Sequence, residues 1–337
     1  MMKQLLCKFL MLSIPLSVFA QTAEEATALP LPQPAVSLEP AEVAFNDSIQ
    51  AAPISLTPPA PTEFAPPVVK TTKSPTAAVL LSALAPGLGH YYLGETRTGN
   101  QLLGGALLGG AAAYAARKDE SLLVTSIYTV QAVSSYGIYA AYRDAKLYNG
   151  DALPLMPRDN FKDLSAAPFR WSVIKKPEVW GGFLGALAAG VTLVYFTHPE
   201  DDADATARVK TTYIEPLSAL PIAISEESLF RGFLQSSLYE ALPAWGAITV
   251  SSLAFGAAHM ANVWDKEPDE QRRYYTFSIP FITAMGAYMG WLSYKNHSLQ
   301  ESTALHMWYD FTLMAAGVLA GKAAIGGRAQ FAHSWEF

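Results

Sequence analysis

The sequence predicts an all-α fold, a polytopic membrane bundle of about eight spans that follows a signal peptide and a disordered Pro-rich linker. Its 337 residues are 51% hydrophobic and only 15% charged, whereas a soluble domain usually carries about 25% charged residues. Long uncharged runs recur from Thr76 onward, each close to the roughly 20 residues that cross a bilayer as a helix. These runs cover residues 76–93, 99–116, 121–142, 178–197, 212–238, 244–261, 274–294 and 302–321. The first is the weakest, because Pro86, Gly87 and Gly89 interrupt it. It could be a re-entrant span or pair tightly with its neighbour.

The first twenty residues are organised like a secretory signal peptide. Lys3 and Lys8 form a basic start, an apolar stretch follows, and residues 18–20 (Val-Phe-Ala) offer a cleavage site. An uncleaved anchor is the alternative, and both readings place Gln21 outside the cytoplasm. The single cysteine, Cys7, lies in this leader, so the mature chain is expected to contain no disulfide and no thiolate metal site.

Residues 21–75 are rich in Pro, Ala, Thr and Glu and show no apolar period. Such a composition buries too little apolar surface to offset its ordering entropy, so we expect a disordered extracytoplasmic linker. The rest of the chain divides by its apolar runs. We expect a three-span unit (76–142), a basic loop (143–177), a five-span core (178–321) and a tail (322–337).

Loop charge predicts the orientation of the bundle. The segment 143–176 carries seven Lys and Arg residues and should be cytoplasmic, whereas the acidic loop 198–210 should lie outside. Three spans lead from an external linker to a cytoplasmic loop, so leader and loop charge agree. Both favour a multi-pass protein of a bacterial inner membrane. The net charge of −6 gives no support to nucleic-acid binding, which needs a basic patch.

Two adjacent glutamates, Glu226 and Glu227, stand inside the fifth apolar run, where ionisable groups are costly and usually functional. On a helix, Glu227 and Arg231 are four residues apart and can pair on one face. Glu226 then points about 100° away and is free to face a cavity. Two carboxylates in such different surroundings suit general acid–base catalysis. A buried Glu–Arg pair that only locks two helices together is the alternative.

Histidines occur with similar spacing in two later runs. Phe255 precedes His259 by four residues, and His306 precedes Asp310 by four. Asp310 could orient His306, or both could face one reacting atom. Hydrogen bonding between helices is the structural alternative for each motif.

Two chemistries fit these groups together. In the first, Glu226, His259 and His306 hold a divalent metal such as Zn²⁺ and its nucleophilic water. In the second, which needs no metal, Glu226 and His259 activate water while His306 and Asp310 stabilise the developing oxyanion. The sequence leaves both open.

The three motifs in this order, EExxxR, FxxxH and HxxxD, resemble the CPBP family of CAAX-prenyl endopeptidases and bacteriocin-processing or immunity-type membrane proteins. The resemblance covers about 212–321, with Asp310 where Asn is common. It implies an all-helical membrane bundle and intramembrane proteolysis. Carried over motif by motif, it makes Glu226 and His259 the water-activating residues, assigns His306 and Asp310 to the oxyanion, and gives Glu227, Arg231 and Phe255 supporting roles.

A looser resemblance involves Pro86-Gly-Leu-Gly-His-Tyr-Tyr-Leu-Gly94, which is similar to the PGxGxxYxG hairpin of small uncharacterised bacterial membrane domains. Those domains usually have Gln where His90 stands. We expect a tight turn or close helix contact here, and His90 as an interfacial polar group more than a ligand.

Two hypotheses of different class follow. The first is an intramembrane endopeptidase that acts on a membrane protein or peptide within the lipid bilayer. The second is a non-catalytic scaffold or immunity-type protein that binds a partner through its linker and first three spans. A proton-coupled transporter is a third, without the repeat symmetry that would support it. The sequence does not define the substrate or the oligomeric state.

Overall fold

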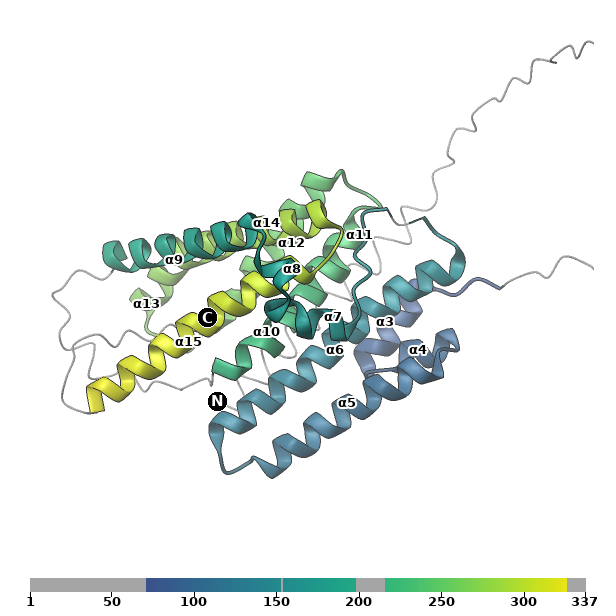
Figure 1. The fold of residues 1–337 in the computed structure, drawn as a ribbon, viewed down its shortest axis with the longest axis horizontal. Helices are drawn as coiled ribbons and strands as arrows, with labels where there is room; N and C mark the ends of the chain where they lie inside the picture. The colour runs from purple at the N-terminus through teal and green to yellow at the C-terminus, as the bar shows by residue number, and fades with distance from the viewer. Residues whose placement is uncertain (1–70, 153, 198–215, 326–337) are drawn as a thin grey trace, which may run out of the picture. The chain divides into compact units, whose positions relative to one another are not determined.

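The computed structural model describes residues 71–152, 154–197 and 216–325, and every regular element in them is a helix (Figure 1). The all-α prediction is therefore confirmed for this part of the chain. The predicted signal peptide, nearly all of the predicted linker, the acidic loop 198–210 and most of the predicted tail lie outside the described residues.

The long helices occur at the predicted apolar runs. They are α5 (Thr96–Ala115), α6 (Glu120–Asn149), α9 (Pro177–Thr197), α12 (Ala244–His259), α14 (Ile279–Asn296) and α15 (Gln300–Ile325). The run 212–238 contains a 3-10 turn, η3 (Pro216–Ser218), then α10 (Ala219–Glu226), the π-helix η4 (Glu227–Gln235) and α11 (Ser236–Leu238). Shorter elements are α13 (Pro268–Arg273), the 3-10 turn η5 (Met260–Val263) and the π-helix η6 (Tyr274–Ser278).

The first apolar run, 76–93, forms two helices joined by a turn, which confirms the tight turn expected at Pro86, Gly87 and Gly89. α3 (Pro75–Leu84) and α4 (Leu88–Leu93) meet at a turn in which Gly87 has φ +93°. A Cβ atom at Gly87 would lie 2.4 Å from the carbonyl oxygen of Gly99 on α5. The turn therefore needs glycine both for its backbone conformation and for the close approach of α5.

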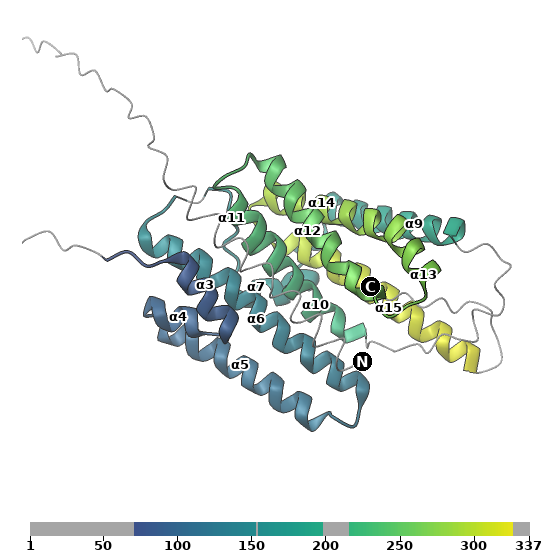
Figure 2. The same ribbon diagram turned by 180° about the vertical axis from the view of Figure 1, so that it is seen from behind.

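Helix α6 is longer than predicted and joins the first helices to those that follow. It packs on α3 and α5 along one side and on α10 and η4 along the other (Figures 1 and 2). Ser135 on α6 shares a hydrogen bond of 2.9 Å with Ser225 on α10. The fully buried ring of Tyr139 lies against Gly232 of η4, where an added Cβ would be 2.7 Å from the ring.

The segment 143–177, expected to be a loop, is partly helical. It contains the last turns of α6, then α7 (Phe161–Ala166), the 3-10 turn η1 (Ala167–Phe169) and α8 (Trp171–Ile174). Its buried Asp159 accepts hydrogen bonds from the Leu299 backbone N–H at 2.7 Å, from Ser298 Oγ and from Gln300 Nε2. A carboxylate at this position suits the positive end of α15. The segment thus fixes the start of the helix that carries His306.

The helices of the second half surround α10 and η4. α10 packs between α6 and α15, while α14 packs against both α12 and α15. α9 lies beside α15, as both views show (Figures 1 and 2). Gly256 allows α12 to approach α14 closely, since a Cβ there would lie 2.0 Å from Thr283 Oγ1.

Across the described residues, no helix combines the length and the apolar composition required to cross a bilayer. Helices are thus present where spans were predicted, and the prediction that they cross a membrane is not confirmed.

Replacing Gly232 by Ala should destabilise the fold by about 1–3 kcal/mol, because the new methyl group would overlap the buried Tyr139 ring. Gly110→Ala on α5 is the matched control, since nothing lies within 4 Å of a Cβ there and Ala favours a helix over Gly. Unfolding of both variants can be followed by circular dichroism. A Gly232→Ala variant as stable as Gly110→Ala would refute the close contact between α6 and η4.

Candidate active site

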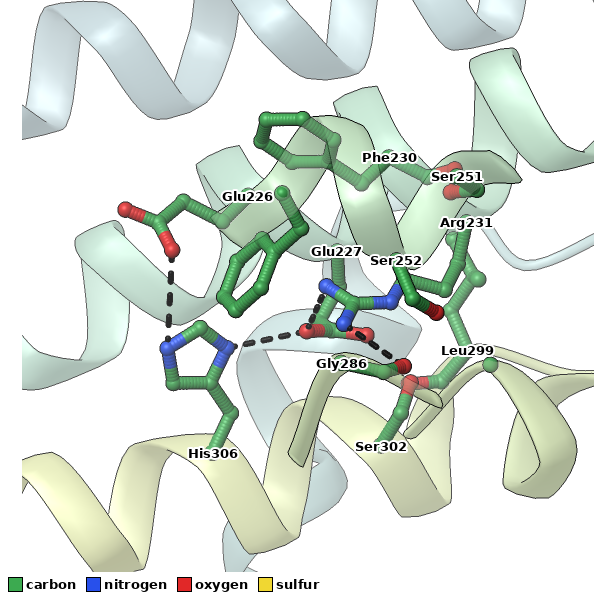
Figure 3. A network of polar contacts seen from close by, with 12 residues as sticks. Glu226, Glu227, Phe230, Arg231, Ser251, Ser252, Gly286, Leu299, Ser302 and His306 are labelled. Atoms are coloured by element: carbon green, nitrogen blue, oxygen red, sulfur yellow. Dashed lines mark hydrogen bonds and ion pairs between the residues drawn. The ribbon is translucent and has the colours of Figure 1, made fainter. Parts of the chain in front are cut away.

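The two adjacent glutamates lie where the helix changes type. Glu226 is the last residue of α10, and Glu227 is the first of the π-helix η4. π-helical turns are rare and often occur at functional sites. The η4 backbone is tied to α12 by Ser251, whose Oγ donates to the Phe230 carbonyl over 2.8 Å. Because neighbouring residues on a helix point about 100° apart, the two carboxylates point in different directions (Figure 3).

Glu227 forms a fully buried ion pair with Arg231. Arg231 Nη1 donates to Glu227 Oε1 over 3.0 Å, and the two side chains are 1% and 0% exposed. Arg231 Nη2 donates to the Gly286 carbonyl of α14 over 3.0 Å (Figure 3). The guanidinium also lies over the Phe255 ring, 4.3 Å from its centroid, a favourable cation–π arrangement. Phe255 thus supports the pair from α12.

His306 lies between the two glutamates. Its Nδ1 is 2.9 Å from Glu227 Oε1, and its Nε2 is 3.7 Å from Glu226 Oε2 (Figure 3). Because Glu227 already accepts from Arg231 it is a carboxylate, so His306 Nδ1 carries the proton of this contact. Nε2 is also 3.4 Å from Asp310 Oδ2 on the next turn of α15. Three carboxylates, those of Glu226, Glu227 and Asp310, therefore surround one imidazole.

His259 faces Glu226 from the end of α12. Its Nδ1 is 2.8 Å from the Phe255 carbonyl oxygen. A carbonyl oxygen can only accept, so Nδ1 is the protonated nitrogen and the neutral ring has its lone pair on Nε2. This Nε2 is 3.9 Å from Glu226 Oε2. The Phe255 ring lies near both histidines, tilted against His259 with the centroids 4.6 Å apart and edge-to-face with His306 at 6.1 Å.

Glu226 Oε2 is buried and has no hydrogen-bond partner, although it faces Nε2 of both histidines. Separations of 3.7 and 3.9 Å exceed a direct hydrogen bond. They suit three groups that act on one small atom between them. All seven residues singled out from the sequence thus belong to a single cluster: Glu226, Glu227, Arg231, Phe255, His259, His306 and Asp310.

Glu226, His259 and His306 could also act as ligands of a metal ion. Each histidine uses Nδ1 as a donor to a second group, which is the usual arrangement behind a metal-bound Nε2. Two ligands of a tetrahedral zinc at about 2.0–2.2 Å lie about 3.3–3.6 Å apart. The two separations from Glu226 are a few tenths of an ångström wider, and the ligand atoms of Glu226, His259 and His306 do not all lie within 4.8 Å of one another. The two histidines would therefore have to move together to bind one ion.

Sequence reasoning missed the role of two glycines on α14. Arg231 donates to the Gly286 carbonyl, and Gln235, one turn later, donates to the Gly290 carbonyl over 3.0 Å. A Cβ at Gly286 would lie 3.1 Å from the Phe255 ring, and one at Gly290 would lie 2.6 Å from Gln235. The Gly286-x-x-x-Gly290 spacing, which is typical of closely packed helices, was the available signal.

Tyr128 was missed as well. It lies on α6 near Glu226 and Asp310. Helix α6 therefore also approaches the cluster.

Residues 210–312 match the family model of the Rce1-like type II CAAX prenyl endopeptidases. The match agrees with the resemblance to the CPBP family that the motifs carried, and it includes all seven residues of the cluster. The helices α3 to α9 precede the matched region. Searches of curated proteins and of solved structures found no match.

Arg231→Met should destabilise the protein by about 3–5 kcal/mol, because it leaves Glu227 buried without its counter-charge. The double variant Glu227→Gln/Arg231→Met removes both charges and should recover part of this loss, since Gln can still accept from His306. Chemical unfolding of the two variants measures the difference. Equal destabilisation by the single and double variants would show that the buried charge is not the cause.

Proposed function

We propose that this protein is an intramembrane endopeptidase that hydrolyses a peptide bond of a membrane-associated substrate with water activated by Glu226 and His259. The supporting observation is the geometry around Glu226 Oε2, which is buried, unbonded and faced by Nε2 of His259 and of His306. The family match supports proteolysis in general. We further propose which residues activate the water and that the substrate is associated with the membrane.

In the proposed reaction, Glu226 takes a proton from water as its oxygen attacks the peptide carbonyl carbon. His259, neutral with its lone pair on Nε2, accepts from the same water and aligns it. The carbonyl becomes an oxyanion, and the C–N bond breaks as the leaving amine takes the proton that Glu226 accepted. Water has then been added across the peptide bond, and Glu226 is again a carboxylate.

His306 is suited to stabilise the oxyanion. Its ring is surrounded by the carboxylates of Glu226, Glu227 and Asp310, and neighbouring negative charge favours the imidazolium form. Protonated Nε2 can donate to developing negative charge in a site of low dielectric. Asp310 holds this proton in position, and the Glu227–Arg231 pair fixes the ring from the other side.

We favour the metal-free form of this chemistry. The separations around Glu226 are wider than those between zinc ligands, and a ring among three carboxylates is better placed to hold a proton than to give up its lone pair. A divalent metal held by Glu226, His259 and His306 would instead supply a bound water of lowered pKa.

A membrane location is supported by apolar side chains on the outer faces of the helices. Leu84, Leu108 and Leu217 are 78%, 75% and 73% exposed. Soluble monomers seldom expose many large apolar groups together, whereas lipid chains cover such groups well. Others that are well exposed are Leu107, Leu184, Val191, Trp245 and Leu253. We infer that the bundle resides in a bacterial inner membrane and acts on a membrane protein or peptide there.

A scaffold or immunity-type role is the second candidate. It is favoured by the helices before residue 210, which lie outside the family match and include α6, packed directly on α10 and η4. Such a protein would keep the polar cluster for its folding and would bind a partner through this additional surface.

Replacing Glu226 by Gln should abolish cleavage while the protein still folds, because the amide cannot take the proton from water. Membrane proteins of cells carrying wild type, Glu226→Gln or the surface control Glu270→Gln can be compared at matched expression by mass spectrometry of fragment ends. Fragments present with wild type and Glu270→Gln, and absent with Glu226→Gln, would support the protease and identify its substrate. Identical profiles in all three would favour the scaffold.

Once a substrate is known, cleavage by the purified protein should persist after dialysis against a chelator, with kcat lowered less than about twofold. The reason is that this mechanism routes no step through a metal. Loss of activity on dialysis, restored by Zn²⁺, in a protein that binds one Zn²⁺ fewer after Glu226→Gln, would replace it with the metal-dependent alternative held by Glu226, His259 and His306.

A further inference from the structure

We propose that His90, Glu95 and Asp144 form a binding site for a divalent transition-metal ion, separate from the active site. Within the described part of the chain, these three residues stand out as a group whose potential ligand atoms all lie within 4.8 Å of one another. His90 lies on α4, Glu95 directly precedes α5, and Asp144 lies on α6. Bound metal would therefore link these elements.

His90 is the central observation. The side chain is completely buried, and neither Nδ1 nor Nε2 forms a hydrogen bond. A buried imidazole without hydrogen bonds loses its solvation without compensation. The closest carboxylate oxygen, Asp144 Oδ2, lies 3.4 Å from Nε2. The buried His90 ring and the nearby Asp144 carboxylate would both be satisfied by an ion bound between them.

The 3.4 Å separation itself supports an ion. It is longer than an N–H···O hydrogen bond of 2.7–3.2 Å. It equals the distance of about 3.3–3.6 Å between an imidazole nitrogen and a carboxylate oxygen that bind the same tetrahedral metal. His90 Nε2 and Asp144 Oδ2 can thus share one ion with little movement.

The local backbone places Glu95 beside His90. Gly94 has φ +89° and ends α4 in the left-handed conformation, and the Glu95 N–H donates to the His90 carbonyl over 2.8 Å. This Schellman-type turn folds the chain back over the last turn of the helix. The turn at Gly94 therefore brings Glu95 close to His90, although the two residues are five positions apart in the sequence. Glu95 is exposed, which leaves an entry path for an ion.

Arg143 is the neighbouring cation and must be included. It donates to Asp144 through Nε at 2.7 Å and Nη2 at 3.2 Å, and to the Asp159 carbonyl through Nη1 at 2.8 Å. It orients the Asp144 carboxylate, as groups behind metal ligands commonly do. Two carboxylates, one arginine and a neutral imidazole leave one net negative charge to attract a dication.

The donor set indicates the class of ion. One imidazole and two carboxylates suit Zn²⁺ or Mn²⁺ better than Ca²⁺, which prefers six to eight oxygen ligands. Three protein ligands leave a fourth position for water. The competing explanation is a protonated His90 paired with Asp144, which needs no ion and no Glu95.

Zn²⁺ binding to the full-length protein tests this proposal. The measurement uses titration calorimetry and metal analysis in a Glu226→Gln/His259→Gln background, so that the active site adds no binding. We expect one Zn²⁺ per chain, bound at least about tenfold more weakly after Glu95→Gln, the loss that changes around a metal site commonly cause. Glu120→Gln, at the far end of α6, should bind as the background protein does.

Glu95 is exposed, so Glu95→Gln should fold normally, and circular dichroism checks this. Added Zn²⁺ should also raise the melting temperature of the background protein more than that of Glu95→Gln. Absence of Zn²⁺ binding, or equal affinity with and without Glu95, would overturn the proposal in favour of the His90–Asp144 ion pair. Neither result depends on whether the protein is a protease.

Discussion

The buried Glu227–Arg231 ion pair is the interaction on which the rest of the active site depends. Two charges removed from water are costly unless each remaining hydrogen-bonding position is used. Arg231 donates hydrogen bonds to Glu227 and to the Gly286 carbonyl, and its guanidinium lies over the Phe255 ring. Glu227 also accepts a hydrogen bond from His306. These contacts reach α12, α14 and α15. The pair thus fixes the relative positions of the helices that carry His259 and His306.

This arrangement explains why two adjacent glutamates do different work. Glu227 is held through Oε1 by both Arg231 and His306, while its buried Oε2 has no hydrogen-bond partner and no histidine Nε2 facing it in an ion pair. Glu226, displaced around the helix by one residue at the junction of α10 and η4, keeps an unbonded oxygen next to two imidazoles. The structural role of the first makes the chemical role of the second possible, because it orients His306 toward Glu226.

The features that could be predicted from the sequence are those encoded in local residue patterns. The apolar runs located nearly all the long helices, and the i, i+4 spacings located Glu227 with Arg231 and His306 with Asp310. Contacts between residues far apart in the sequence could not be predicted from such local patterns. Nothing near Asp159 indicates that it binds the start of α15, 140 residues later. The break at Gly87 was visible, but the choice between a re-entrant span and two helices depends on the packing of Gly99 against it.

The helices before the family match are part of the active-site architecture. Helix α6 contacts η4 where the Tyr139 ring packs on Gly232, and it contacts α10 where Ser135 and Ser225 share a hydrogen bond. Larger side chains at these positions would not fit. The segment after α6 holds the start of α15 through Asp159. Both ends of the cluster, Glu226 and His306, are therefore positioned by residues outside 210–312. A metal ion at His90, Glu95 and Asp144 would act on this same helix, by fixing α6 against α4 at the end farthest from Tyr128.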